Sequence, residues 1–184
     1  MIVSIDDGCA SDMRAAELLQ KYDVEGIFYW PLNWHSIAYS KGYKPLSFED
    51  AFDISRLFEI GSHTLTHRHL TTLGEDDLED EIIGSKQALE LLFQTDINKF
   101  CPPRGYTNPQ ITALTLEHYD NQRLTKGKHL VHIHPDSGAN DGKPWRECIS
   151  KDTKELWGHS HEFDRYNMWE EIEEVLREIA THGK

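Results

Sequence analysis

The sequence has no long hydrophobic run, and this lack excludes one class of protein at the outset. No apolar stretch approaches the roughly 20 residues that a membrane-spanning helix needs. Internal repeats, low-complexity segments and linkers rich in Pro, Gly or Ser are missing as well. We therefore expect the 184 residues to form a single domain, residues 1–184, that is long enough to bury a hydrophobic core.

Basic residues are scarce. The chain carries 19 Lys and Arg against 32 Asp and Glu, a formal net charge of -13. A nucleic-acid backbone or an anionic membrane surface requires positive charge on the protein, so we expect neither as a partner. The balance also favours a neutral or cationic substrate over a polyanion. Much of the acid lies in residues 75–81 and 170–178, where solvated helix faces are expected.

Cysteine is rare, and so is any signal for export. Cys9, Cys101 and Cys148 are odd in number and widely spaced, which excludes a CxxC zinc pattern and argues against a disulfide framework. A reducing compartment is the simplest interpretation. Acids appear by residue 6 and no basic segment precedes the first apolar run, unlike a signal peptide. From the sequence as given we expect a cytoplasmic protein.

Short apolar runs alternate with helical patterns along the chain, which is typical of βα units. Ser11, Ser47 and Asn108 are expected to cap three of the helices. Seven strands with helices between most of them predict an α/β fold, an irregular seven-stranded (β/α) barrel. The predicted strands are Ile2–Ile5, Val24–Trp30, Glu59–Ser62, Lys99–Cys101, Arg123–Thr125, His129–His134 and Leu156–His159. The predicted helices are Ser11–Tyr22, Phe48–Leu57, Asp76–Phe93, Pro109–Tyr119 and Met168–Thr181.

Two adjacent acids, Asp6 and Asp7, end the first predicted strand. Like charges this close repel each other, and a divalent cation would relieve the repulsion. His63 and His67 offer nitrogen ligands, and an Asp with two His is a three-ligand set that suits zinc and leaves one position for water. The pattern indicates a metal-dependent hydrolase. Taken singly, Asp7-Gly8 is also a turn dipeptide, and Thr64 excludes the HExxH zinc motif.

Four polar motifs follow predicted strands. Because the C-terminal ends of barrel strands build one common site, we expect these motifs to meet. They are Asp6-Asp7 after the first strand, His63 after the third, Pro102–Gly105 after the fourth and Gly158-His159 at the end of the last.

In this combination the chain resembles the polysaccharide deacetylase family, carbohydrate esterase family 4, which has the nodulation-factor deacetylase (NodB) homology fold. The resemblance covers nearly the whole chain, with the motifs in the order of the family. The first motif of the family is Thr-Phe-Asp-Asp-Gly, and the second is His-Ser/Thr-x-x-His followed by Leu. The matching segments are Ser4–Gly8, Gly61–His67 with Leu70, Phe100–Gly105 and Leu156–Phe163.

The resemblance implies one divalent metal ion, zinc in the first place, with cobalt, nickel or manganese as alternatives. Its ligands would be Asp7, His63 and His67. Asp6 would be the general base and His159 the general acid, with His161 as a local alternative to His159. The backbone N–H of Arg104 would help to stabilise the oxyanion.

The chain departs from the family pattern in two places. Cys101 stands where the family usually has the Arg that orients the base, and Arg104 is the nearby replacement that the sequence offers. The Asp-x-x-Asp-Trp motif that usually supports the catalytic His has no clear equivalent, and Asp136 and Asp141 are the candidates.

Aromatic side chains near the expected mouth of the barrel could stack on a sugar ring, although packing is an equal alternative for them. Trp34 and Tyr106 are the predicted substrate-binding residues of this kind, with Trp30 and Trp145 as further candidates. His134 is predicted to contact the substrate because it ends a strand at the same end of the barrel.

These features predict a metal-dependent hydrolase that removes N-acetyl groups from an N-acetylated sugar or polysaccharide. Its partner would be a small-molecule or oligosaccharide substrate. A hydrolase of a non-sugar C–N amide is one alternative, since a fold does not determine a substrate. The other alternative is a catalytically silent metal- or carbohydrate-binding module, which Cys101 and the missing supporting motif favour and the complete set of Asp and His residues opposes.

Overall fold

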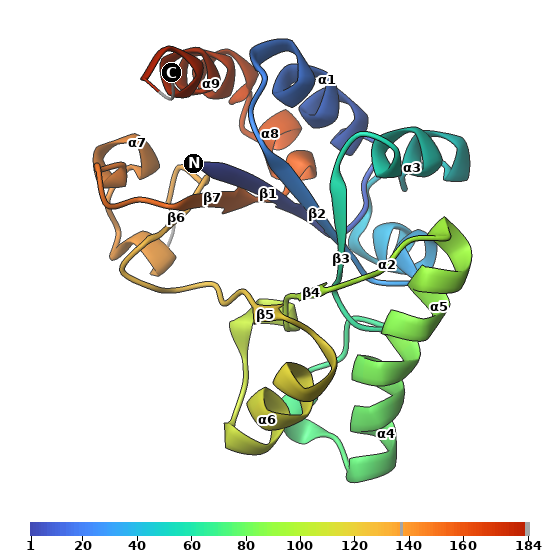
Figure 1. The fold of residues 1–184 in the computed structure, drawn as a ribbon. Helices are drawn as coiled ribbons and strands as arrows, with labels where there is room; N and C mark the ends of the chain where they lie inside the picture. Colours follow the sequence, from blue (N-terminus) through green and yellow to red (C-terminus); the bar gives the residue numbers. More distant parts are fainter. Residues whose placement is uncertain (137, 183–184) are drawn as a thin grey trace.

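A computed structural model describes residues 1–136 and 138–182. Its centre is a seven-stranded, wholly parallel sheet in the order β5-β4-β3-β2-β1-β7-β6 (Figure 1). In the described part of the chain no pairing joins β5 to β6, so the sheet curls into a half-barrel that stays open between them. The strands are β1 Ile2–Asp6, β2 Gly26–Trp30, β3 Glu59–Ser62, β4 Lys99–Phe100, β5 Asn121–Gln122, β6 Leu130–His132 and β7 Glu155–Gly158.

The predicted fold class is confirmed, and all seven strands lie close to their expected places. The fifth is displaced: the sequence predicts Arg123–Thr125, whereas the strand is Asn121–Gln122. Arg123 therefore lies just beyond the C-terminal end of β5, and its backbone N–H donates to the carbonyl of Phe100 at 2.8 Å. This shift directs a buried arginine to the end of the sheet where the polar motifs gather.

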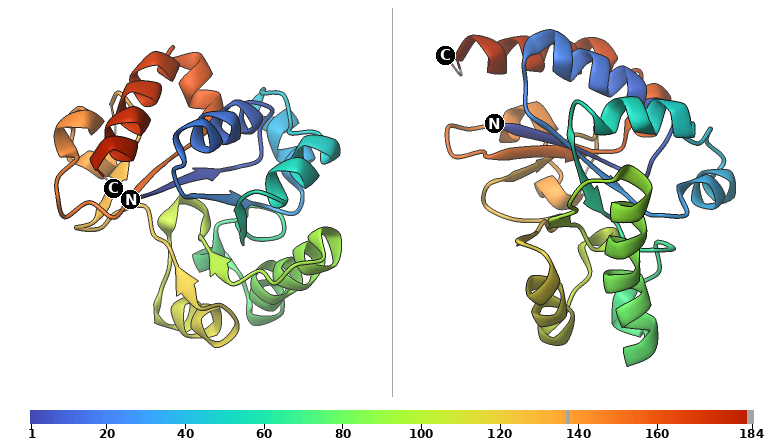
Figure 2. Two further views of the ribbon diagram at one scale, coloured as in Figure 1. Left: turned by 45° about the horizontal axis from the view of Figure 1, so that its top comes forward. Right: turned by 45° about the vertical axis from the view of Figure 1, so that its right-hand side comes forward.

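Helices cover the outside of the curled sheet, and α1 packs against α9 (Figure 2). The predicted caps differ in outcome. Ser47 and Asn108 accept backbone N–H groups at the starts of α3 and α6, whereas the Ser11 side chain makes no cap hydrogen bond. The helices are α1 Asp12–Tyr22, α2 Trp34–Lys41, α3 Phe48–Ser55, α4 Glu75–Glu79, α5 Ser85–Phe93, α6 Pro109–His118, α7 Trp145–Cys148, α8 Ser160–Arg165 and α9 Trp169–His182.

Sequence reasoning misses α2, α7 and α8. A signal for α2 is present, because Lys41 in its last turn is followed by Gly42, which takes the left-handed conformation (φ 79°) typical of a helix C-terminus. The other two are short and lie within segments expected to be motif or loop.

The helix predicted over Asp76–Phe93 is interrupted by a π-helical stretch, Asp80–Gly84, between α4 and α5. Glu81 in this stretch is only 2% exposed, although the acids of residues 75–81 were expected on a solvated face. Its carboxylate accepts the backbone N–H of Thr66 at 2.9 Å and the Thr66 hydroxyl. Single π turns often occur at functional sites, and this one turns an acid toward the loop that carries His67.

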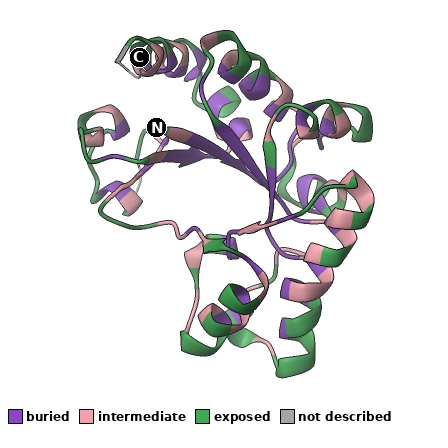
Figure 3. Ribbon diagram, viewed as in Figure 1, coloured by how far each residue is buried: buried purple, intermediate pink, exposed green. Residues whose placement is uncertain are grey.

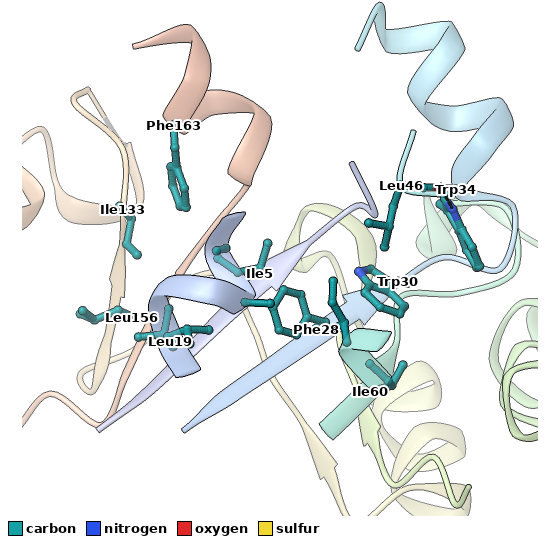
Figure 4. Close-up of a cluster of buried hydrophobic side chains, with 14 of the residues drawn as sticks. Ile5, Leu19, Phe28, Trp30, Trp34, Leu46, Ile60, Ile133, Leu156 and Phe163 are labelled. Carbon is teal, nitrogen blue, oxygen red and sulfur yellow. Dashed lines mark hydrogen bonds between the residues drawn. The ribbon is translucent and has the colours of Figure 1, made fainter. Parts of the chain in front are cut away.

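Apolar side chains of the central strands pack against the helices in one large core, and Ile27, Tyr29 and Cys101 form a second, smaller cluster (Figures 3 and 4). β2 is buried at every position, as expected for a parallel strand that is covered on both faces. Trp30 at its end also makes a polar contact, since its indole N–H donates to Asp12 at 2.8 Å. Burial raises the pKa of Asp12 to about 7, although the hydrogen bonds from Ser160 and Trp30 act to lower it.

No helix in residues 1–136 and 138–182 is long and apolar enough to cross a membrane.

Substitutions at two buried tryptophans measure how much the Trp30–Asp12 hydrogen bond contributes to the free energy of unfolding. Trp30→Phe removes the N–H that Asp12 accepts, whereas Trp145→Phe removes a buried N–H that has no hydrogen-bond partner. Both variants lose the same ring area, so we expect Trp30→Phe to cost about 1–3 kcal/mol more in the free energy of unfolding. Urea denaturation measures the difference. Equal losses in the two variants would show that the hydrogen bond contributes nothing.

Candidate metal centre

Asp7, His63 and His67 come together at the C-terminal ends of β1 and β3. Nε2 of His67 lies 3.1 Å from Asp7 Oδ1, and Nε2 of His63 lies 3.5 Å from the same oxygen. The three ligand atoms are all within 4.8 Å of one another. The three residues predicted as metal ligands are therefore neighbours in the structure.

The backbone around these residues takes conformations that L-amino acids rarely adopt. Asp7, Thr64 and His67 have φ values of 83°, 73° and 61°. Such positions cost on the order of 1–3 kcal/mol each and persist only where the surroundings enforce them. Here the Thr64 hydroxyl accepts the backbone N–H of His67 at 2.9 Å, while Glu81 binds Thr66 between them.

His63 is held in one tautomer. Its Nδ1 lies 2.6 Å from the carbonyl oxygen of Cys101, so Nδ1 carries the proton and donates it. Burial lowers the pKa of His63 to about 4, which keeps the ring neutral. The lone pair of a neutral imidazole then remains on Nε2, the atom that faces Asp7. A hydrogen bond of this kind behind a histidine is the usual support of a metal ligand.

One oxygen of the Asp7 carboxylate is paired with a lysine, and the other faces two histidines. Oδ2 is 2.6 Å from Nζ of Lys41, at the end of α2. Oδ1 is buried and lacks a hydrogen bond of acceptable geometry, although both histidine Nε2 atoms face it. Burial alone would raise the pKa of Asp7, but His67, His159 and Lys41 hold it well below its usual range. An ionised oxygen and two imidazole nitrogens around one point fit a divalent cation.

A second set of residues also meets the spacing for a metal, namely Asp6, His63 and Cys101. It is the poorer set for two reasons. Arg123 already contacts the Asp6 carboxylate, and burial raises the pKa of the Cys101 thiol well above its ordinary value. Asp7, His63 and His67 are therefore the better ligand set.

Asp6 is oriented by Arg123. The guanidinium donates from one terminal nitrogen to Asp6 Oδ1, and its Nε lies 3.6 Å from Glu155. Burial by itself would lower the pKa of Arg123, but Asp6 and Glu155 raise it above its usual value, so the ion pair is maintained. The proposal that Arg104 replaces the arginine absent at Cys101 is wrong, because Arg123 performs this contact from the end of β5.

Arg104 itself is exposed and lies in the turn Pro103–Gly105, with φ at 61°. The next residue, Gly105, also has a positive φ (69°). A Cβ atom on Gly105 would come within 2.2 Å of Thr125 Oγ1, so only glycine fits there. The turn thus has a single shape, and an oxyanion role for the Arg104 N–H stays a prediction.

His159 follows β7, and Glu162 on α8 holds it in place. Its Nδ1 lies 2.9 Å from Glu162, which directs Nε2 toward Asp7 Oδ2 at 3.9 Å. Burial would lower the pKa of His159, but Glu162 and Asp7 raise it to about 9. Asp136 and Asp141, the candidates from the sequence, are both exposed, and Glu162 takes their place as the supporting residue.

Two further histidines, His132 and His134, lie in the same region. Glu162 also faces His132 at 3.9 Å and His134 at 3.8 Å. His134 lies beyond the end of β6 at His132, and its contact with the substrate stays a prediction. His161 points elsewhere: its ring stacks on Tyr43 with a centroid separation of 4.3 Å. Of the two rivals for the general acid, His159 is therefore the one that contacts Asp7.

Of the aromatic residues considered for sugar stacking, only Tyr106 is available. It is 50% exposed and stacks on His69 at 4.5 Å. The prediction for Trp34 is wrong because its side chain is 0% exposed and donates to the carbonyl of Leu46 at 2.9 Å (Figure 4). Trp30 and Trp145 are also buried and belong to the core.

Comparison with known proteins identifies a family for this chain. The sequence model of the family described as polysaccharide deacetylase matches residues 1–119, more than half of the chain. No curated protein matches the chain significantly.

Several solved structures share the fold. A carbohydrate esterase family 4 pseudoenzyme from Bacillus anthracis is 18% identical with a TM-score of 0.67, and the match covers 95% of this chain and 61% of that one. The peptidoglycan deacetylase PdaC from Bacillus subtilis is 15% identical with a TM-score of 0.69, covering 99% and 84%. A family 4 carbohydrate esterase from Bacillus anthracis is 16% identical with a TM-score of 0.63, covering 96% and 75%.

At these identities the structural likeness shows the fold alone. The chain spans 61–63% of the length of the pseudoenzyme structures that it matches.

Arginine substitutions test which side chain neutralises Asp6. Arg123→Met leaves a buried carboxylate without its partner, and we expect a loss of about 3–5 kcal/mol in the free energy of unfolding. Arg104→Met changes an exposed residue and should stay within about 0.5 kcal/mol. Chemical denaturation measures both, and adding Asp6→Asn to Arg123→Met should recover part of the loss. A comparable loss in Arg104→Met would contradict the assignment.

Proposed function

The chain belongs to the polysaccharide deacetylase family, and we propose that it is a metal-dependent hydrolase that removes the acetyl group from an N-acetylated sugar. The observation that supports this proposal best is the convergence of His63 and His67 on the unpaired, buried oxygen of Asp7. A base and an acid, Asp6 and His159, flank that point on neighbouring strand ends. Metal ligation, proton acceptance and proton donation are the three tasks of such a hydrolysis.

Asp7 Oδ1, His63 Nε2 and His67 Nε2 would hold the metal ion. A divalent cation bound there would lower the pKa of a coordinated water and polarise the acyl oxygen. The set leaves an open coordination position, as in hydrolytic zinc sites. Zinc is the ion that we propose, with cobalt, nickel or manganese as substitutes, because imidazole and carboxylate suit several divalent ions.

Asp6 would take the proton from the attacking water. A general base must be fixed in place, and the buried contact with Arg123 meets this condition. Arg123 is itself enclosed between the rings of Tyr29 at 5.0 Å and Trp157 at 4.8 Å. The guanidinium cannot swing away without losing both ring contacts, so the carboxylate keeps one orientation.

His159 would donate a proton to the leaving amine. Glu162 accepts from Nδ1 and stabilises the protonated ring, so Nε2 carries a proton on the side that faces Asp7. The same carboxylate fixes the plane of the ring. The backbone N–H of Arg104 would stabilise the oxyanion, while Tyr106 and His134 would contact the sugar.

A catalytically silent module remains the second candidate, because structures similar in fold include pseudoenzymes of carbohydrate esterase family 4. The ion pair between Lys41 and Asp7 is compatible with this alternative, since an ammonium group already neutralises part of the ligand set. The pairing of Asp6 with Arg123 and of His159 with Glu162 favours the enzyme, because binding alone requires neither.

Acetate release separates the two candidates. Protein loaded with zinc or cobalt should release acetate from N-acetylglucosamine or its oligomers, and treatment with a chelator should abolish the release. Asp6→Asn should reduce the rate by about 10²–10⁴-fold, the usual contribution of a general base. Acetate release from simple amides but not from sugars would show that the substrate is a non-sugar amide. No acetate with any metal would make the silent module the better description.

The pH profile tests the pairing of His159 with Glu162. Since His159 must be protonated to act as the acid, the rate should fall as the pH rises through its pKa. Glu162→Gln removes a partner that raises this pKa, so the alkaline limb should move to lower pH by about one unit or more. Glu117→Gln, an exposed change on α6, is the matched control and should leave the limb in place. An unmoved limb in Glu162→Gln would exclude His159 as the acid.

A further inference from the structure

We propose that a cavity beside the metal centre binds an anionic group, a carboxylate or a phosphate, carried by the sugar that the centre deacetylates. The inference rests on the proposed function for the identity of the reaction, but the cavity and its charges stand on the structure itself. It narrows the substrate from N-acetylated sugars in general to those that bear a negative charge.

The cavity has a volume of about 510 Å³ and lies between three segments of the chain. These are the loop after β1 (residues 9–11), the end of α2 with the loop that follows (residues 41–44), and α8 (residues 161, 164 and 165).

Hydrogen bonds tie the walls of the cavity to one another. The backbone N–H of Ala10 donates to the carbonyl of Lys44 at 2.8 Å, which joins the first wall to the second. Cys9 Sγ lies 2.8 Å from Ser160 Oγ, and the Ser11 hydroxyl donates to Asp164, which join the first wall to the third. The cavity therefore has fixed walls and does not depend on a mobile loop.

Three cationic side chains line the cavity: Lys41, Lys44 and Arg165. Lys41 is paired with Asp7, but neither Lys44 nor Arg165 forms an ion pair with any carboxylate in the described residues. Asp164 is the one acid among the lining residues. Its carboxylate already accepts from Ser11 and, at 2.7 Å, from the indole N–H of Trp169.

The local charge is thus opposite in sign to that of the whole chain. A net charge of -13 favours a neutral or cationic substrate when the chain is considered as a whole. Charges separated by more than about 8 Å are largely screened at physiological ionic strength, so the lining of a cavity decides what binds inside it. Lys44 and Arg165 outnumber Asp164 in the lining of this cavity, and such a local excess of positive charge in an otherwise acidic protein indicates an anionic ligand.

Lys41 connects the cavity to the reaction centre. Nζ of Lys41 forms an ion pair with Asp7 Oδ2. Lys41 also lines the cavity, together with Tyr43 and His161. In this proposal the sugar ring of an amide held at Asp7 lies next to this wall of the cavity. A charged substituent on that ring would then lie on the side of Lys44 and Arg165.

The charges of the centre favour an anion over a further cation. His132, His159 and Glu162 also meet the spacing for a metal ion. Glu162 of that set already accepts from His159 Nδ1 at 2.9 Å, and none of the three residues lines the cavity. An anion in the cavity would be attracted by Lys41, Lys44 and Arg165.

The test compares sugars that differ only at C6. N-acetylglucosamine is the neutral member, its 6-phosphate carries a phosphate, and N-acetylglucosaminuronic acid carries a carboxylate. We expect the metal-loaded protein to show kcat/KM about tenfold or more higher for at least one anionic sugar, mainly through a lower KM. The two charged sugars distinguish phosphate from carboxylate.

The variant Lys44→Gln/Arg165→Gln should bring the ratio of anionic to neutral kcat/KM close to one. A general loss of activity would lower kcat/KM for both sugars by the same factor, so it would not change this ratio. Arg56→Gln, a change at an exposed residue that follows α3 and does not line the cavity, is the matched control and should keep the ratio of the wild type. A wild-type ratio near one, or an unchanged ratio in the double variant, would overturn the proposal.

Binding without turnover separates failure of this inference from failure of the proposed function. Calorimetry with glucose and glucose 6-phosphate or glucuronic acid requires no hydrolysis. Tighter binding of a charged sugar that is lost in Lys44→Gln/Arg165→Gln would support the anionic site even if no acetate is released. Equal or undetectable binding of all three sugars would overturn it even in an active deacetylase.

Discussion

The two buried carboxylates at the end of β1 are the constraint on which the site depends. Asp6 and Asp7 are adjacent in sequence, each is almost fully enclosed, and an unpaired buried charge costs several kcal/mol. Asp6 is paired with Arg123, which comes from the end of β5. Asp7 is paired on one oxygen with Lys41 from α2, and its other oxygen is left to His63 and His67. Distant parts of the chain must therefore meet at this point for the acids to be tolerated.

The backbone around these carboxylates is strained. Asp7, Thr64, His67 and Arg104 all have positive φ values, and each lies where the chain leaves the C-terminal end of a strand. The energy that holds them comes from elsewhere, namely the apolar core between the sheet and its helices, and from Glu81, which the π-helical stretch turns toward residues 64–67. Strain gathered at one end of a sheet is typical of a functional site.

Local patterns were sufficient to predict the sheet and the proximity of Asp7, His63 and His67, because each strand is a short apolar run and the three residues lie in two compact motifs. What the sequence does not reveal are partners that meet only in three dimensions. Arg123 is 117 residues from Asp6, and it sits where a strand was expected, so nothing local marks it as a partner. Trp34 was placed at the barrel mouth because α2 was not predicted, whereas that helix buries its ring. Glu162 is only three residues from His159, and a helix starting at Ser160 would have revealed it.

The proposed metal centre of Asp7, His63 and His67 can be tested directly. Anomalous X-ray diffraction at the zinc absorption edge, from crystals of the protein grown with zinc, locates the ion. We expect one strong peak within coordination distance of Asp7 Oδ1, His63 Nε2 and His67 Nε2, and its loss in His63→Ala. A peak among His132, His159 and Glu162 instead, or no peak in the wild-type protein, would contradict it.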